Sequence, residues 1–137
     1  MKENESFARG VAHFNAGEFF EAHEVWEEIW LASHGSEKAF LQGLIQIAAA
    51  FHHHARGNTR GLNSLLIAGL AKIEGAPNDY RDVALEEFRA EVSRWLEVSS
   101  SPGSPVPKRE KLPRIRRATR GKPKASTRIA PKEKRGG

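Results

Sequence analysis

His23 and Glu27 stand four residues apart in the aromatic segment 19–30, Phe-Phe-Glu-Ala-His-Glu-Val-Trp-Glu-Glu-Ile-Trp. A helix turns by about 100° per residue, so this spacing places both ionisable side chains on one helical face. The same projection puts four aromatic side chains around them: Phe19, Phe20, Trp26 and Trp30. A carboxylate on such an apolar face needs hydrogen bonds or a charged partner, because burial alone penalises its ionised form. This face is therefore the first place to look for a site.

The expected partners are two glutamines in another apolar segment. Gln42 and Gln46 are the polar side chains within residues 39–51. If the two segments form a helical hairpin, His23 lies level with Gln46, and Glu27 lies level with Gln42. Two interpretations stay open: a buried polar network that fixes the register of the helices, or a pocket floor where His23 and Glu27 act as an acid–base pair or as ligands.

Three consecutive histidines, His52–His54, raise the question of a metal site. Consecutive helical residues diverge by about 100°, so the three cannot converge on one ion. We interpret them as partly buried or capping histidines near a helix C-terminus. The alternative is a metal site that joins His52 or His53 to His23 or Glu24. Because the chain has HExxE rather than HExxH and lacks a Glu-x-x-His pair, we predict no metal and no cofactor.

A polar turn, Arg56-Gly57-Asn58, follows the histidines. It would suit an anion at the start of the next helix, or Asn58 would simply cap that helix while Arg56 reaches Glu24 or Glu27. An ion pair with Arg56 would keep Glu27 ionised and make general-base chemistry less favourable. The complete candidate cluster is His23, Glu24, Glu27, Gln42, Gln46, Arg56 and Asn58, with Phe19, Phe20, Trp26 and Trp30 as walls.

Helical periodicity runs through the first 98 residues and predicts the elements that carry these side chains. The first expected helix carries Phe7, Val11 and Phe14 and is stopped by Asn15 and Gly17. The second and third cover about 18–32 and 37–55, with Ser36 as the N-cap of the third. The fourth is capped by Asn58 and has an apolar stripe from Leu62 to Ile73, and the fifth is opened by Asp79 or Asp82. The segment 37–55 is apolar nearly all round and should be central, with Gly43 allowing close approach of another helix. We predict an all-α fold, a compact antiparallel bundle of about five helices in domain 1–98.

The composition changes after Val98. Residues 99–137 contain thirteen Lys or Arg and two acidic residues, a balance of +11, whereas residues 1–98 carry −6. This Pro-rich tail has no aromatic residue and is predicted to be disordered. Arg120-Gly-Lys122-Pro-Lys124 resembles the AT-hook core, with Lys122 in place of the central arginine. A nucleic acid or another polyanion is therefore the expected partner of the tail, and a solubilising extension is the alternative.

Other functions are limited by composition. The chain has no cysteine, which excludes disulfides and thiolate catalysis, and its acidic start does not resemble a signal peptide. We expect no membrane span and a cytoplasmic location, and exposed aromatic surface would allow homo-oligomers. The leading hypothesis is a non-enzymatic binding or interaction module. The alternative is a small-molecule or metal-dependent enzyme that uses His23, Glu24 and Glu27.

The sequence motifs at 14–30, 40–50 and 56–58 resemble those of the family called domain of unknown function 309. The resemblance covers roughly residues 7–73 and leaves the tail outside. It implies an all-α fold and no established activity. The positions that match the family pattern are His23, Glu24, Trp26, Glu27, Gln42, Gly43, Gln46 and the turn Arg56-Gly57-Asn58.

Overall fold

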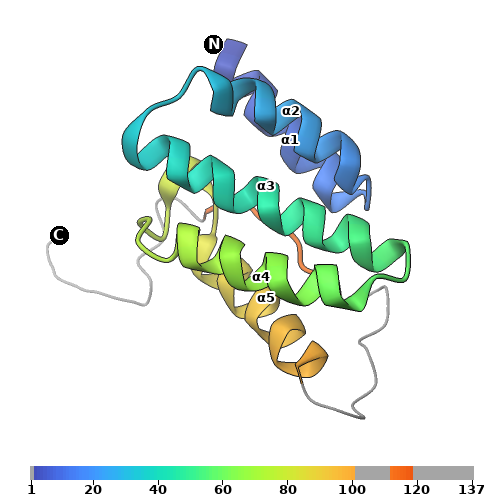
Figure 1. Cartoon of the computed structure of the whole chain (residues 1–137). Coiled ribbons are helices and arrows are strands. Elements are labelled where there is room, and N and C mark those ends of the chain that lie inside the picture. The colour runs from blue at the N-terminus through green and yellow to red at the C-terminus, as the bar shows by residue number, and fades with distance from the viewer. Residues whose placement is uncertain (1, 101–111, 119–137) are drawn as a thin grey trace, which may run out of the picture.

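Five α-helices follow one another along the chain (Figure 1). The computed structural model describes residues 2–100 and 112–118. Its elements are α1 (Lys2–Asn15), α2 (Phe19–Leu31), α3 (Gly35–Ala55), α4 (Thr59–Ile73), a 3₁₀ turn η1 (Tyr80–Asp82) and α5 (Leu85–Ser99). Consecutive helices pack on one another, and α3 lies between α2 and α4 (Figure 1). The predicted all-α class is confirmed, and none of the helices described is long and apolar enough to cross a bilayer.

The core is aromatic and centres on α3. As predicted, the apolar stretch 39–51 of α3 is central, with eight buried residues and the others half-buried. The buried residues are Phe40, Leu41, Gly43, Leu44, Ile47, Ala48, Ala50 and Phe51. Phe51 packs edge-on against Trp95 of α5, with ring centroids 5.1 Å apart. Both Trp26 and Trp95 are fully buried, so α2 and α5 each contribute their largest side chain to one interior.

The approach of α3 to α4 depends on two glycines. A Cβ atom on Gly43 would lie 2.9 Å from the carbonyl oxygen of Gly69, and one on Gly69 would lie 2.8 Å from the carbonyl oxygen of Gly43. The two backbones therefore touch where neither residue has a side chain. This confirms that Gly43 permits the close approach of another helix.

Two of the expected helix starts differ from the prediction. Helix α3 begins at Gly35, after His34, so Ser36 lies inside the first turn and is not the N-cap. Helix α5 begins only at Leu85, because Arg81 and Asp82 have φ angles of 54° and 61°, which a right-handed helix cannot contain. The Asn58 cap is confirmed, since its Oδ1 accepts a hydrogen bond from the Gly61 N–H at 2.9 Å.

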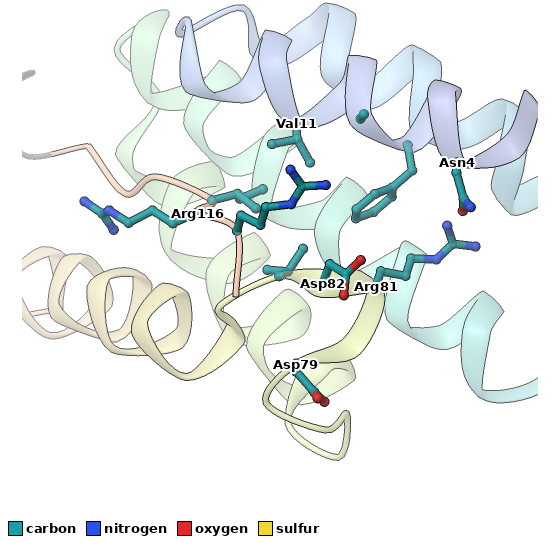
Figure 2. A pocket seen from close by; sticks show the side chains of 11 residues that line it. Asn4, Val11, Asp79, Arg81, Asp82 and Arg116 are labelled. Carbon is teal, nitrogen blue, oxygen red and sulfur yellow. The ribbon is translucent and has the colours of Figure 1, made fainter. Parts of the chain in front are cut away.

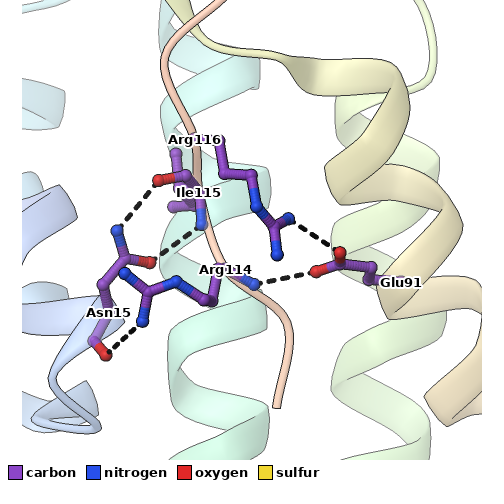
Figure 3. A network of polar contacts seen from close by, with 5 residues as sticks. All are labelled: Asn15, Glu91, Arg114, Ile115 and Arg116. Carbon is purple, nitrogen blue, oxygen red and sulfur yellow. Dashed lines mark hydrogen bonds and ion pairs between the residues drawn. The ribbon is translucent and has the colours of Figure 1, made fainter. Parts of the chain in front are cut away.

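Residues 112–118, which we call the strap, lie on the helical domain (Figure 3). Asn15, at the end of α1, donates through Nδ2 to the Ile115 carbonyl at 2.9 Å and accepts the Ile115 N–H through Oδ1 at 2.8 Å. Glu91 of α5 accepts the Arg114 N–H at 2.9 Å and pairs with the Arg116 guanidinium at 2.7 Å. The strap therefore bridges α1 and α5.

The prediction of a disordered tail is wrong for the strap. The average composition of residues 99–137 is too polar for folding, but Pro113 and Ile115 place two apolar side chains on one side of an extended segment, and both are buried. Two backbone bonds to the segment before α5 add to this: Ala84 N–H to the Arg116 carbonyl and Ala118 N–H to the Asp82 carbonyl. Arg120, Lys122 and Lys124 lie outside the described residues.

Replacement of Gly43 or Gly69 by alanine is expected to lower the free energy of unfolding by about 1–3 kcal/mol, because the added methyl overpacks the α3–α4 contact. Urea unfolding followed by circular dichroism measures this change. Gly75→Ala is the control, since a Cβ atom there has no neighbour within 4 Å. Equal midpoints for all three variants would contradict the tight contact.

Replacement of Asn15 by alanine is expected to release the strap. The variant loses both hydrogen bonds to Ile115, which together contribute about 1–3 kcal/mol. Amide exchange at Ile115 should accelerate by at least about fivefold. Asn63→Ala is the matched control, because the hydrogen bonds of Asn63 within the described residues go to Ser99 and Ser100 and not to the strap. Unchanged Ile115 exchange in Asn15→Ala would show that other contacts hold the strap.

Candidate functional site

The residues of the predicted polar cluster are not joined by the hydrogen bonds that the sequence suggested. His23 is half-buried, and its Nδ1 atom and the Oε1 atom of Gln46 are buried without a hydrogen-bond partner. Within residues 2–100 and 112–118 no hydrogen bond links His23 to Gln46 or Glu27 to Gln42. Among these residues the register-fixing network is therefore not formed by the predicted hydrogen bonds, and the pocket with an acid–base pair stays a prediction.

Glu24 and Glu27 are both exposed on α2, so the prediction that Glu27 lies on the apolar face is wrong. The buried residues of α2 are Phe19, Ala22, Trp26 and Ile29. Helical geometry places Glu27 about 120° from the centre of that face. The buried face of α2 differs from the predicted one because both α1 and α3 cover α2, whereas the prediction placed α2 against α3 alone.

The predicted aromatic walls separate into two groups. Phe19 and Trp26 belong to the core, at 5% and 0% exposure. Phe20 is 47% exposed and contacts two imidazoles, with ring centroids 6.1 Å from His23 and 5.6 Å from His52. Trp30 is half-buried, and the Lys38 ammonium lies 4.4 Å from its ring centroid. The structure thus places three rings in a row between α2 and α3: His23, Phe20 and His52, with Phe20 in the middle.

The histidine run does not form a metal site in the part of the chain that the structure describes. No group of three His, Cys, Asp or Glu side chains there is arranged to hold an ion. His53 Nδ1 instead accepts a hydrogen bond from Asn58 Nδ2 at 3.2 Å, next to the cap of α4. Arg56 is exposed, and no ion pair joins it to Glu24 or Glu27 among the described residues. The turn at 56–58 is therefore an ordinary helix cap.

A cleft that the sequence did not predict lies between α1, the segment around η1 and the strap (Figure 2). Its volume is about 620 Å³. It is lined by Asn4, Phe7, Ala8, Val11, Asp79, Arg81, Asp82, Val83, Ile115, Arg116 and Arg117. These residues come from three segments far apart in the sequence, so spacing alone could not reveal them. The available signal was the alternation of apolar and basic residues at 112–117.

The turn on one side of the cleft is strained and tightly held. Arg81 and Asp82 are consecutive non-glycine residues in the left-handed region, a conformation that costs on the order of 1–3 kcal/mol per residue. The Arg81 guanidinium pairs with Glu37 of α3 and lies 5.0 Å from the ring centroid of Phe7. The Asp82 carbonyl accepts a hydrogen bond from Ala118 of the strap at 2.7 Å. Contacts with α1, α3 and the strap thus maintain the turn.

The environment of His54 shifts the pKa of its side chain. Its ring lies edge-on to Trp95, with centroids 5.0 Å apart, and burial lowers the pKa of this imidazole. Protonation therefore favours the unfolded chain, in which the histidine returns to its ordinary pKa. Between the lowered folded pKa and the ordinary value the unfolded state binds more protons, so stability falls as pH falls through this range.

The melting temperature is accordingly expected to be lower at about pH 5 than at about pH 7.5, with part of the difference due to His54. Thermal unfolding of His54→Gln at both pH values should give a smaller difference than the wild type. His34→Gln, at an exposed position, serves as the control and should retain the wild-type difference. The same difference in both variants would contradict the role of His54.

Comparison with known proteins gives a family but no activity. Residues 7–65 match the family model described as "Domain of unknown function (DUF309)". An uncharacterized protein of Aquifex aeolicus is 30% identical over 105 residues, which are 74% of this chain and 32% of that protein. The uncharacterized protein YpuF of Bacillus subtilis is 32% identical over 73 residues, 53% of this chain and 42% of YpuF. The chain thus spans less than half the length of either relative, and residues 7–65 are the part of it that matches the DUF309 family model.

Proposed function

We propose that this protein is a non-catalytic binding module whose helical domain anchors a basic C-terminal segment for contact with nucleic acid. The observation that carries the proposal is the alternation along the strap. Pro113 and Ile115 are buried against the helices, while Arg114, Arg116 and Arg117 are exposed. An extended segment directs successive side chains to opposite sides, so Pro113 and Ile115 hold the segment while Arg114 and Arg116 face solvent. Arg117, which follows Arg116 directly, is exposed at the edge of the cleft.

The contacts that Arg114 and Arg116 make within the protein are weak enough to be replaced by contacts with phosphate. The Arg116–Glu91 pair is at the surface, with the Arg116 side chain 45% exposed, and exposed pairs contribute about 0–1 kcal/mol. Arg114 donates to the Asn15 carbonyl at a long distance of 3.4 Å. Phosphate oxygens could replace both acceptors while backbone bonds and buried side chains keep the strap in place.

The distribution of charge favours the same segment. The domain at 1–98 carries a net charge of −6, which disfavours binding of a polyanion, whereas residues 99–137 carry +11. Arg120, Lys122 and Lys124 follow the strap directly. An anchored start restricts where these three cations can be, which reduces the entropy lost when they bind phosphates.

The enzyme alternative has less support. It requires Glu24 or Glu27 to act with His23, yet both glutamates are exposed and neither bonds to His23 in the described part of the chain.

The experiment is a salt series of fluorescence anisotropy with a labelled duplex DNA and a labelled single-stranded RNA. Binding by the full chain should weaken steeply as KCl rises, because counterions are released from the phosphates. The triple variant Arg120→Gln, Lys122→Gln, Lys124→Gln should reduce the slope of log Kd against log salt by about 2–3, since each lost phosphate contact lowers it by about 0.9.

The matched control removes the same charge farther from the strap: Lys132→Gln, Lys134→Gln, Arg135→Gln. It should change the slope less, because these residues are not adjacent to the anchored segment. Equal slopes in the two triple variants would reject a role for the anchor. A full chain without salt-dependent binding would reject the nucleic-acid proposal, and equal binding of heparin would point to polyanions in general.

A further inference from the structure

We propose that the cleft between α1, η1 and the strap binds a small amphipathic anion: an apolar body carrying one carboxylate or phosphate group. The volume of about 620 Å³ is within the range of about 300–1,000 Å³ usual for small-molecule sites. This proposal concerns a small ligand and not a nucleic acid, although Arg116 and Arg117 of the strap take part in both proposals.

The apolar part of the ligand is indicated by the floor of the cleft. Phe7, Val83 and Ile115 are exposed by only 6%, 4% and 3%, and each presents side-chain surface to the cleft. Val11, half-buried on α1, extends this surface (Figure 2). Contact with these side chains removes apolar area of the ligand from water, at about 25 cal/mol per Å².

Most of the charged side chains that line the cleft already have partners within the protein. Of the three arginines, Arg81 pairs with Glu37 and Arg116 pairs with Glu91. In the absence of a ligand, both of these arginines therefore have a carboxylate partner within the protein, and neither charge is unpaired.

The two aspartates do not supply a free negative charge to the cleft. Asp82 has a partner within the protein. Asp79 is exposed, and Figure 2 shows its carboxylate directed away from Val11 and Asp82. Neither carboxylate is therefore directed toward the apolar part of the cleft as an unpaired charge.

Arg117 is the lining residue whose charge remains. It is exposed, and no acidic side chain of residues 2–100 or 112–118 pairs with it. Its backbone is fixed opposite Val83 by the isolated bridge between the strap and the segment before α5. A guanidinium held at the edge of an apolar floor suits the planar, bidentate recognition of a carboxylate or phosphate.

The strained turn is a second, independent observation at the same place. Left-handed Arg81 and Asp82 bring the Arg81 guanidinium over Phe7 and the Asp82 carbonyl to the strap. Such strain persists only where surrounding contacts over-determine it, and it concentrates at ligand sites. Here the turn preorganises one wall of the cleft, so that a ligand need not order it on binding.

The test is a titration of the full chain, labelled with ¹⁵N, with octyl phosphate, octanoate and 1-octanol as probes. The amide signals of Val83 and Ile115 report on the floor of the cleft. Saturable shifts are expected at both amides with at least one of the two anions. A comparison of the Kd values of octyl phosphate and octanoate identifies which of the two head groups the site prefers. The neutral alcohol should bind at least about tenfold more weakly, since it lacks the charge-assisted bond to Arg117.

Two pairs of variants separate the site from general surface effects. Arg117→Gln should raise the Kd of the anion by about tenfold, whereas Arg114→Gln removes the same charge from the strap outside the cleft and should change it by less than about twofold. Ala8→Trp should fill the cleft and abolish the shifts. Ala12→Trp places the same side chain at an exposed position of α1 outside the cleft and should leave them unchanged.

Three results would overturn the proposal. The first is the absence of saturable shifts at Val83 and Ile115 with either anion. The second is equal affinity for 1-octanol, and the third is an equal effect of Arg117→Gln and Arg114→Gln. Because the titration uses no nucleic acid, its failure would leave the salt-dependent binding of DNA or RNA to be decided by its own experiment.

Discussion

The burial of Phe14 is the interaction on which the rest of this structure depends. This ring, 1% exposed, contacts the rings of Phe19, Trp26, Phe51 and Phe88 at centroid distances of 5.1–6.3 Å. It therefore joins α1 to α2, α3 and α5 at one point. Asn15, the next residue, is the one that receives the strap. Because side chains in such a cluster allow little adjustment, the position of Phe14 also determines where Asn15 can meet Ile115.

Packing of α1 against the core also determines the shape of the cleft, because Phe7 of this helix lines it. Trp26 packs against Gly10, where a Cβ atom would collide with the indole, and its Nε1 donates to the Phe7 carbonyl at 3.3 Å. Phe7 is thereby held with one side toward the core and another toward the cleft, below the Arg81 guanidinium. Each wall of the cleft is thus attached to the core by a specific contact, which explains how a surface site is built on a short helix.

Sequence reasoning succeeded where the information was local or concerned a single helix. The burial of α3, the close approach at Gly43 and the Asn58 cap follow from apolar periodicity, side-chain size and turn chemistry. The site was harder to predict. The exposure of Glu27 depends on which helices cover α2, and that is a property of the whole packing. A small error in the orientation of a helical face is enough to move a side chain from buried to exposed.

The strap and the cleft were missed for a different physical reason. Composition averages over the tail, but docking needs only a few residues that match a surface already built by the helices. Ile115 contributes one buried side chain and two backbone bonds, and these gain stability because Asn15 is already ordered at the end of α1. Disorder predicted from average composition therefore does not exclude a short segment that binds its own domain.

The strap takes part in both proposed sites, and this links them thermodynamically. A ligand that binds only when the strap is docked stabilises the docked state, by about 2.7 kcal/mol at a concentration one hundred times its Kd. That is comparable with the contribution of the Asn15–Ile115 bonds, about 1–3 kcal/mol. By reciprocity, a nucleic acid that draws the strap arginines away from the domain would weaken an anion in the cleft, and one that binds the docked strap would strengthen it. The sign of this coupling therefore reports whether the strap stays on the helices when nucleic acid binds.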